Sequence, residues 1–328
     1  MANIRGTKSA VLATATGATL AGLLACIAST FEAQAQGAMP RWGNQKLDKA
    51  RACQRQIAKM KRIDRTEAVR VMPYALASSF AYNDRSNAPA PGFKRDVNWT
   101  AILRRARVGK SLISMYENAG FSAAIYRDGN KKEIIIAYRG TEIPEHALQL
   151  LTNASRRDAF LKDFSTDVRA RFVHAPSVSL DPQYVAGVAL AKRITDENWG
   201  YTISLTGHSL GGAVASYAGH WIGAYNVVTF NAARNPYSTI GNNPNQINII
   251  VSADMVGDPR RKALGEGCLP GTYVTVPTTT PQNMITRHSI QGIIGGLISV
   301  NKCEICDMAL SAAAYAYTSG FAWPTSTP

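Results

Sequence analysis

The chain has 328 residues, of which 46% are hydrophobic and 8% aromatic, and its formal net charge at pH 7 is +14. This composition is typical of a globular protein with a sizeable core, and it excludes a low-complexity or disordered chain. The positive charge favours anionic partners such as an anionic membrane surface or a cell-envelope polymer. The basic residues are scattered and no nucleic-acid-binding motif accompanies them, so we expect no nucleic-acid partner.

The N-terminus has the pattern of an export signal. Two basic residues precede an uncharged, Ala- and Leu-rich run over residues 10–27, and an A-x-A cleavage sequence follows at 33–35. We therefore expect a signal peptide over 1–35 and a secreted or periplasmic protein. An uncleaved N-terminal membrane anchor is one alternative, because the run approaches spanning length. A lipoprotein with Cys26 in a lipobox-like sequence is the other.

Cleavage would leave four cysteines, Cys53, Cys268, Cys303 and Cys306. An even number is typical of a chain exported to an oxidising compartment, and it allows two disulfides in three connectivities. The C-x-x-C spacing of the last two also occurs in metal and redox sites. No second such pair and no nearby histidine accompany it, so we expect no metal and no cofactor.

The first elements are predicted to be helical. Apolar residues at helical spacing indicate a surface helix over 44–62 and a second helix from Asp64 to about residue 82. Pro73 either kinks the second helix or marks its true start. Residues 83–98 contain two prolines and a glycine and are predicted to form a loop.

Two strands follow, over 121–126 and 133–138, with the hairpin signal Asp128-Gly129-Asn130 between them. The second strand ends in Arg139-Gly140-Thr141. Residues 142–178 show no clear strand pattern, and we interpret this long segment as a candidate active-site lid.

From residue 181 onward strands alternate with helices. A helix is predicted over 181–198, with Pro182 in its first turn, and another over 302–320. The apolar run 292–300 is too short to span a membrane and is expected in the core. The alternation predicts an α/β fold with a mainly parallel sheet flanked by helices. The predicted strands are 201–206, 225–230, 246–251 and 272–276.

The sequence Gly207-His208-Ser209-Leu210-Gly211 lies between the strand 201–206 and a small-residue helix over 212–221. A G-x-S-x-G motif in that context is typical of a sharp strand-to-helix turn that exposes a nucleophilic serine. The helix N-terminus also offers backbone N–H groups to a developing oxyanion. Ser209 is therefore the candidate nucleophile.

A serine nucleophile needs a base and an orienting acid, which in this fold class follow it in the order Ser, acid, His. Of the two downstream histidines, His220 lies about 16 Å along the same helix, so His288 is the candidate base. The carboxylates between Ser209 and His288 are those of Asp254, Asp258 and Glu266. We favour Asp254 because it follows a strand directly, at the edge where α/β sheets place their chemistry.

An oxyanion hole needs two donors. One is predicted to be the backbone N–H of Leu210, the residue after the nucleophile. The second is expected from Gly140-Thr141, at the end of an earlier strand; the alternative is that Gly140 simply makes a turn.

Together these landmarks resemble the class 3 lipase branch of the α/β-hydrolases, over roughly residues 65–320. The motifs that carry the resemblance are Tyr138-Arg-Gly-Thr141, Asp163-Phe-Ser-Thr-Asp167, Gly207–Gly212, Asp254-Met-Val256 and His288. The resemblance implies a Ser209–Asp254–His288 triad, with Thr141 and Leu210 forming the oxyanion hole. It also implies a catalytic domain over 65–328, preceded by a helical extension over 36–64.

Two departures from the family pattern stand out. The segment 142–162 is longer than the usual lid-bearing segment. The Asp motif normally continues with proline, whereas Gly257 follows here, which keeps Asp258 as a rival acid.

The predicted function is that of an exported serine hydrolase that cleaves lipid esters through an acyl-enzyme, as a triacylglycerol lipase or a phospholipase. One alternative is a catalytically silent α/β-hydrolase scaffold that binds anionic membrane or envelope surfaces. Another keeps the enzyme class and makes the chain a phospholipase secreted as a toxin against other cells.

Overall fold

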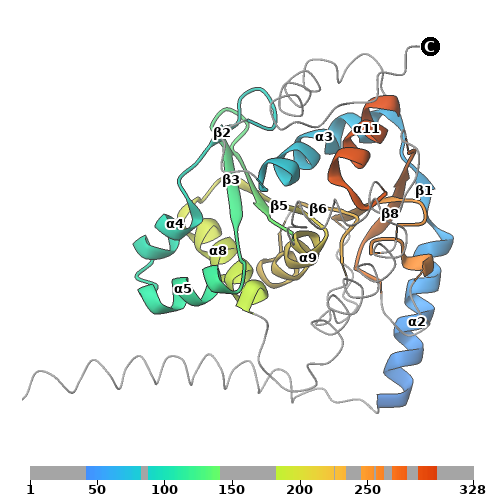
Figure 1. Cartoon of the computed structure of the whole chain (residues 1–328), viewed down its shortest axis with the longest axis horizontal. Coiled ribbons are helices and arrows are strands. Elements are labelled where there is room, and N and C mark those ends of the chain that lie inside the picture. Colours follow the sequence, from blue (N-terminus) through green and yellow to red (C-terminus); the bar gives the residue numbers. More distant parts are fainter. Residues whose placement is uncertain are drawn as a thin grey trace, which may run out of the picture. The chain divides into compact units, whose positions relative to one another are not determined.

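The computed structural model describes residues 42–82, 88–140, 182–224, 226–233, 245–254, 256–261, 268–278 and 287–300 (Figure 1). The chain divides into two compact units, Met1–Asp48 and Lys49–Pro328, and the second unit holds every described strand. The predicted signal peptide, the candidate lid and the helix predicted over 302–320 lie outside the described residues.

The described residues form one eight-stranded sheet in the order β1-β8-β7-β6-β5-β4-β3-β2. In this spatial order, neighbouring strands are parallel from β1 through β8, β7, β6 and β5 to β4. The last two pairs, β4 with β3 and β3 with β2, are antiparallel. The strands are β1 Lys61–Arg62, β2 Lys94–Arg95, β3 Ala123–Asp128, β4 Glu133–Tyr138, β5 Thr202–His208, β6 Asn226–Phe230, β7 Gln246–Val251 and β8 Thr272–Val276.

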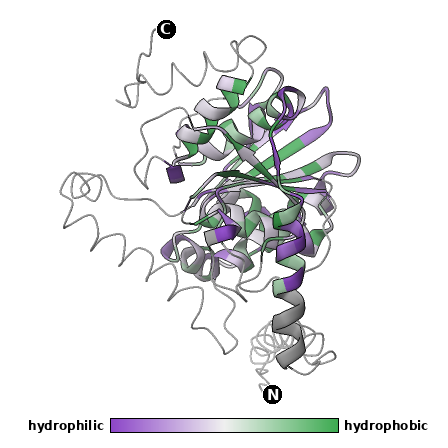
Figure 2. Cartoon of the chain, turned by 90° about the vertical axis from the view of Figure 1, so that its right-hand side faces the viewer, coloured by the Kyte–Doolittle hydropathy of each residue, from purple (hydrophilic) through white to green (hydrophobic). Residues whose placement is uncertain are grey.

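Helices cover both faces of this sheet, which Figure 2 shows between two helical layers. The helices α3 and α11 pack on one face and α8 and α9 on the other, where α4 and α5 pack against α8. The helices are α2 Trp42–Ala58, α3 Arg65–Phe80, α4 Trp99–Arg105, α5 Lys110–Asn118, α8 Pro182–Glu197, α9 Leu210–Ile222 and α11 Ile290–Val300, with a 3₁₀ turn at Pro259–Arg261.

The two faces follow from the alternation of side chains along each strand. In β4, Ile135 and Ala137 point into the core with α3 and α11, while Ile134 and Ile136 point into the core with α8 and α9. A strand buried on both faces reads as a continuous apolar run, as β4 does. The predicted mainly parallel α/β sheet with helices on its faces is confirmed.

The N-terminal part differs from the prediction. The helix predicted over 44–62 ends at Ala58, and β1 pairs with β8 instead of continuing it. The next helix begins at Arg65, where the Asp64 side chain accepts a hydrogen bond of 2.8 Å from the backbone N–H of Glu67. Pro73 lies inside this helix and is not its start.

Three further elements between residues 83 and 118 were missed, and the apolar run 292–300, expected only to lie in the core, is part of the helix α11. The predicted loop over 83–98 contains β2, which pairs with β3. No element was predicted over 99–118, where α4 and α5 form. The side chain of Asn98 caps α4 by accepting from the N–H of Thr100 at 3.1 Å, a sequence signal of the kind that marks a helix start.

A disulfide joins Cys53 of α2 to Cys268, which precedes β8. Of the pairings that the sequence left open, the structure therefore has Cys53 with Cys268. The other two cysteines, Cys303 and Cys306, lie outside the described residues. Within the part of the chain that the structure describes, no helix has the length and apolarity needed to cross a membrane. The predicted domain boundaries at 35/36 and 64/65 stay predictions.

Candidate active site

Ser209 occupies the sharp turn between β5 and α9, with φ 56° and ψ −125°. This left-handed conformation is strained for a residue with a side chain. It is held by backbone hydrogen bonds on both sides: the Ser209 N–H donates to the Phe230 carbonyl at 3.0 Å, and its carbonyl accepts from the N–H of Ala233 at 2.9 Å. The turn is thereby fixed to the end of β6.

The glycine at 211 is required by the close approach of α9 to β4. A Cβ added there would lie 2.1 Å from the Tyr138 carbonyl oxygen, a contact with backbone that cannot move aside. The first turn of α9 therefore packs directly on the end of β4, and this brings its N-terminus to the carboxyl edge of the sheet.

His288 lies between Ser209 and Asp254. Its Nε2 is 2.9 Å from the Ser209 Oγ, and its Nδ1 is 3.0 Å and 3.2 Å from the two Asp254 carboxylate oxygens. All three residues are buried, and Asp254 is only 1% exposed. Because the carboxylate can only accept, Nδ1 carries a proton toward Asp254 and leaves Nε2 able to accept the hydroxyl proton.

The Asp254 carboxylate is fixed by two backbone donors. Its Oδ1 accepts from the N–H of Val256 at 3.0 Å and from the N–H of Gly257 at 2.5 Å. Gly257 is the position at which the class 3 lipase pattern has proline, which would lack this donor. The departure seen in the sequence thus supplies a hydrogen bond to the carboxylate next to His288.

The other candidate acids and bases are placed elsewhere. Asp258 forms an ion pair of 2.6 Å with Arg260 and accepts from the N–H of Ala253 at 2.7 Å. Burial alone would raise the pKa of Asp258, but these hydrogen bonds hold the pKa below its usual value. His220 is exposed on α9, and Glu266 lies outside the described residues.

The predicted oxyanion hole is described in part. Leu210 is the first residue of α9, so its N–H has no intrahelical acceptor and points out of the helix N-terminus. Gly140 lies against the serine turn: a Cβ there would lie 2.5 Å from the His208 carbonyl oxygen and 3.3 Å from the Ser209 Cβ. Thr141 lies outside the described residues, so its part in the oxyanion hole stays a prediction.

Three residues beside this site were not found from the sequence. They are His208, Tyr82 and Asn231. His208 contacts His288 and Tyr82, and Asn231 contacts Arg287. His208 lies inside the G-x-S-x-G motif, which drew attention only to its serine. Asn231 follows β6 with φ 40°, and no local sequence signal marks it.

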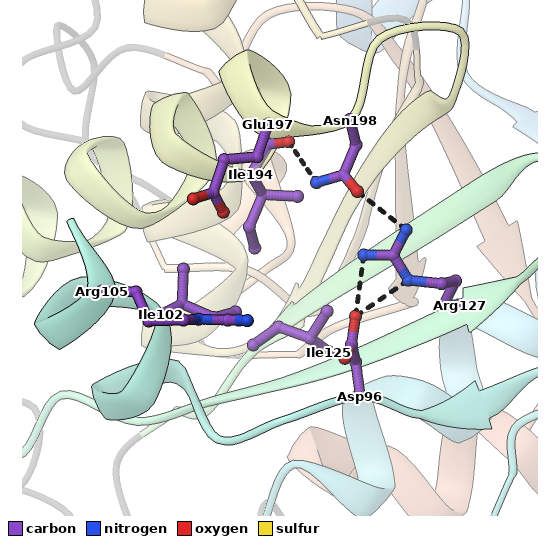
Figure 3. A pocket seen from close by; sticks show the side chains of 8 residues that line it. All are labelled: Asp96, Ile102, Arg105, Ile125, Arg127, Ile194, Glu197 and Asn198. Carbon is purple, nitrogen blue, oxygen red and sulfur yellow. Dashed lines mark hydrogen bonds and ion pairs between the residues drawn. The ribbon is translucent and has the colours of Figure 1, made fainter.

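A separate cavity of about 260 Å³ lies at the opposite edge of the sheet, where Ile102, Ile125 and Ile194 lie among five polar or charged side chains (Figure 3). Among these, Arg127 donates to Asp96 at 2.9 Å and to Asn198 at 2.8 Å. These bonds tie β3 to the residues that directly follow β2 and α8. The cavity lies near the start of β5 and Ser209 follows the end of β5, so about 20 Å of strand separates the cavity from the candidate active site. Among the described residues, no three His, Cys, Asp or Glu side chains are grouped as metal ligands would be.

A mainly parallel sheet with a serine in this strand-to-helix turn, and a histidine and an aspartate beside it, is the arrangement of an α/β-hydrolase. The model of one protein family, described as the Tle-like phospholipase domain, matches residues 73–248, more than half of the chain. The chain belongs to this phospholipase-like family, and it is a hydrolase of the lipase and phospholipase type.

Solved structures of fungal lipases are also similar. Lip2 lipase from Yarrowia lipolytica has 16% sequence identity and a TM-score of 0.42, with 73% of this chain and 91% of that chain covered. A triacylglycerol lipase from Penicillium expansum has 15% identity and a TM-score of 0.40, covering 66% and 82%. The Rhizomucor miehei lipase in its propeptide complex has 15% identity and a TM-score of 0.38, covering 71% and 79%. The comparison with curated proteins found no match.

Proposed function

We propose that the chain hydrolyses carboxylic esters of lipids through an acyl-enzyme on Ser209. The observation that supports this most directly is the unbroken series of contacts from the Ser209 Oγ through His288 to Asp254. A serine hydroxyl is a poor nucleophile by itself, and this arrangement provides the base and the orienting acid that it lacks.

In the proposed reaction, the Ser209 Oγ attacks the ester carbonyl carbon while the His288 Nε2 takes the hydroxyl proton. The negative charge that develops on the carbonyl oxygen is stabilised by the Leu210 N–H at the start of α9, with Thr141 as the predicted second donor. His288 then donates the proton to the leaving alcohol oxygen, and the acyl group stays on Ser209. A water molecule, deprotonated by His288, releases the carboxylic acid and restores the serine.

For the substrate we propose a lipid ester, and among lipids a glycerophospholipid. The description of the family as phospholipase-like supports this choice. The formal net charge of +14 supports attraction to an anionic membrane surface. Exposed cations gather between α4 and α5, where Arg104, Arg105, Arg107 and Lys110 lie within seven residues of one another.

We further propose that the protein is exported after removal of residues 1–35. The disulfide between Cys53 and Cys268 supports an oxidising compartment, because such bonds do not persist in a reducing cytosol. Intact-mass measurement of the protein from its native host tests this, since the mature chain should begin at residue 36.

The test of activity compares wild type with Ser209→Ala on p-nitrophenyl butyrate, p-nitrophenyl palmitate and phosphatidylglycerol vesicles. We expect wild-type turnover of the long-chain ester and the vesicles, a loss of about 10³-fold or more in Ser209→Ala, and an unchanged melting temperature. Turnover of butyrate alone would indicate an esterase without lipid specificity. Equal rates for the two proteins would overturn the proposal and favour the silent scaffold.

A further inference from the structure

The ring of His208, the residue before the nucleophile, has a partner on each nitrogen. Its Nε2 lies 2.5 Å from the backbone carbonyl oxygen of His288, and its Nδ1 lies 2.9 Å from the Tyr82 hydroxyl. A carbonyl can only accept, so Nε2 carries the proton and donates it. In a neutral imidazole Nδ1 is then an acceptor, and the Tyr82 hydroxyl donates to it.

The surroundings of His208 keep its ring neutral. Burial, followed by the nearby His288 ring at 4.8 Å, lowers the pKa of His208 from 6.5 to about 3. The His288 carbonyl therefore selects the tautomer of a neutral ring with its N–H on Nε2, and the Tyr82 hydroxyl donates to the Nδ1 that this tautomer leaves unprotonated.

Asn231 provides a second attachment to the same segment. Its side-chain Nδ2 donates to the Arg287 carbonyl at 2.7 Å, while its Oδ1 accepts from the N–H of Val251 at 2.9 Å. Asn231 is fully buried and follows β6 directly. Two successive carbonyls, those of Arg287 and His288, are thus bound by side chains at the ends of neighbouring strands.

The helix that follows does not replace these attachments. The Ser289 hydroxyl accepts from the N–H of Gln291 at 3.2 Å, so α11 is capped by the residue that directly precedes it. The side chain of His288 has both ring nitrogens engaged with Ser209 and Asp254. Among the described residues, the backbone of His288 is fastened to the sheet through the carbonyls of residues 287 and 288.

We propose that His208 and Asn231 are positioning residues that hold the His288 backbone at the distance where its imidazole can take the Ser209 proton, and that Tyr82 acts through His208. This rests on the proposed function of Ser209 and His288. A displacement of about 1 Å in such a geometry costs about 100-fold in rate. We expect substrate binding to be retained in variants of His208 and Asn231, because their side chains bind the backbone carbonyls of residues 287 and 288.

The experiment measures saturable modification of Ser209 by a fluorophosphonate, which separates the limiting rate constant from the half-saturating concentration. His208→Leu removes the donor to the His288 carbonyl. His208→Gln retains an amide N–H near the place of Nε2. Ser78→Ala is the matched control, because it removes a buried 2.9 Å hydrogen bond to Thr206 of the same strand without touching the triad.

We expect His208→Leu to lower the limiting rate constant about 10- to 100-fold with an unchanged half-saturating concentration. His208→Gln should recover to within about fivefold of wild type, and Ser78→Ala should react at the wild-type rate. All rates are taken below the melting temperature of each variant. If His208→Leu does not fold, Tyr82→Phe takes its place, with an expected loss of about 2- to 10-fold in the same constant.

Wild-type reactivity in a folded His208→Leu variant would overturn the positioning role, as would a His208→Gln variant that is as slow as His208→Leu. A wild-type protein that does not react at Ser209 at all would instead contradict the proposed function. The two failures are therefore distinguishable in one series of measurements.

Discussion

Among the described residues, Ser209 is one of three with side chains that adopt positive φ within two residues of the end of a parallel strand. Asn231 follows β6 with φ 40°, and Ala253 follows β7 with φ 64°. Such conformations cost about 1–3 kcal/mol each and persist only where surrounding bonds over-determine them. Here they turn the chain sharply at adjacent strand ends, which presents Ser209, Asn231 and Asp254 at one edge of the sheet.

Replacing Asp254 or Asp258 by asparagine shows which of the two carboxylates orients His288. Asp254→Asn leaves the shape unchanged but removes the charge that orients the His288 tautomer, so kcat on p-nitrophenyl butyrate should fall about 10³- to 10⁴-fold. Asp258→Asn should leave kcat within about threefold of wild type and lower the free energy of unfolding by about 1–3 kcal/mol, because it weakens the contact with Arg260. A large loss of kcat in Asp258→Asn with normal Asp254→Asn activity would reverse the assignment.

The buried His208 also makes stability depend on pH. Its pKa is about 3 in the folded chain and 6.5 in the unfolded chain, so only the unfolded state binds this proton between those values. The stability that neutral His208 contributes is complete above pH 6.5 and is lost as pH falls toward 3, by about 1.4 kcal/mol per pH unit.

Urea unfolding from pH 7 down to pH 4 checks this dependence. Other groups titrate in the same range, so the quantity of interest is the difference between wild type and His208→Gln. That difference should shrink steadily below pH 6.5. A difference that does not change with pH would mean that His208 titrates normally in the folded chain.

The packing of α9 on β4 and β5 positions the nucleophile, and Gly211 is its tightest point. We expect Gly211→Ala to lower the free energy of unfolding by about 3 kcal/mol, since its methyl group would meet the Tyr138 carbonyl. Gly129→Ala is the control, because a Cβ there meets nothing within 4 Å. Equal urea midpoints for the two variants would contradict this account of the turn.

The disulfide ties α2 to the approach to β8 across 215 residues of sequence. Replacing both Cys53 and Cys268 by alanine should lower the free energy of unfolding by about 2–5 kcal/mol, because the unfolded chain gains freedom. Peptide mapping without reduction should recover the two cysteines in one linked peptide. Recovery of Cys53 joined to Cys303 or Cys306 would show a different connectivity.

The sequence allowed most of the sheet to be predicted, because strands buried on both faces read as apolar runs between turn signals. The two-residue strands β1 and β2 have no period to detect, and only their pairing with β8 and β3 defines them. In the site, chain order and elimination led to Ser209 and His288 and favoured Asp254 over Asp258, and the structure brings Ser209, His288 and Asp254 together. His208 and Asn231 were missed because they bind backbone carbonyls, which no residue type or motif in the sequence marks.

The positive charge of the chain should govern its binding to lipid surfaces. We expect binding to phosphatidylglycerol vesicles to weaken about tenfold or more between 0.05 M and 0.5 M NaCl, because salt screens exposed charges. Replacing Arg104, Arg105, Arg107 and Lys110 together by glutamine should weaken it similarly at low salt. Vesicle sedimentation with phosphatidylcholine as the neutral control measures both effects. Salt-independent binding would contradict an electrostatic attraction.

The most direct test of the central claim is to trap the acyl-enzyme. Wild-type protein mixed with p-nitrophenyl butyrate and quenched in acid is digested, and the peptide that contains Ser209 is examined by mass spectrometry. We predict a butyryl group on Ser209, and none on the same peptide from Ser209→Ala. Ester turnover with no acyl group on Ser209, or with the acyl group on another residue, would contradict the account.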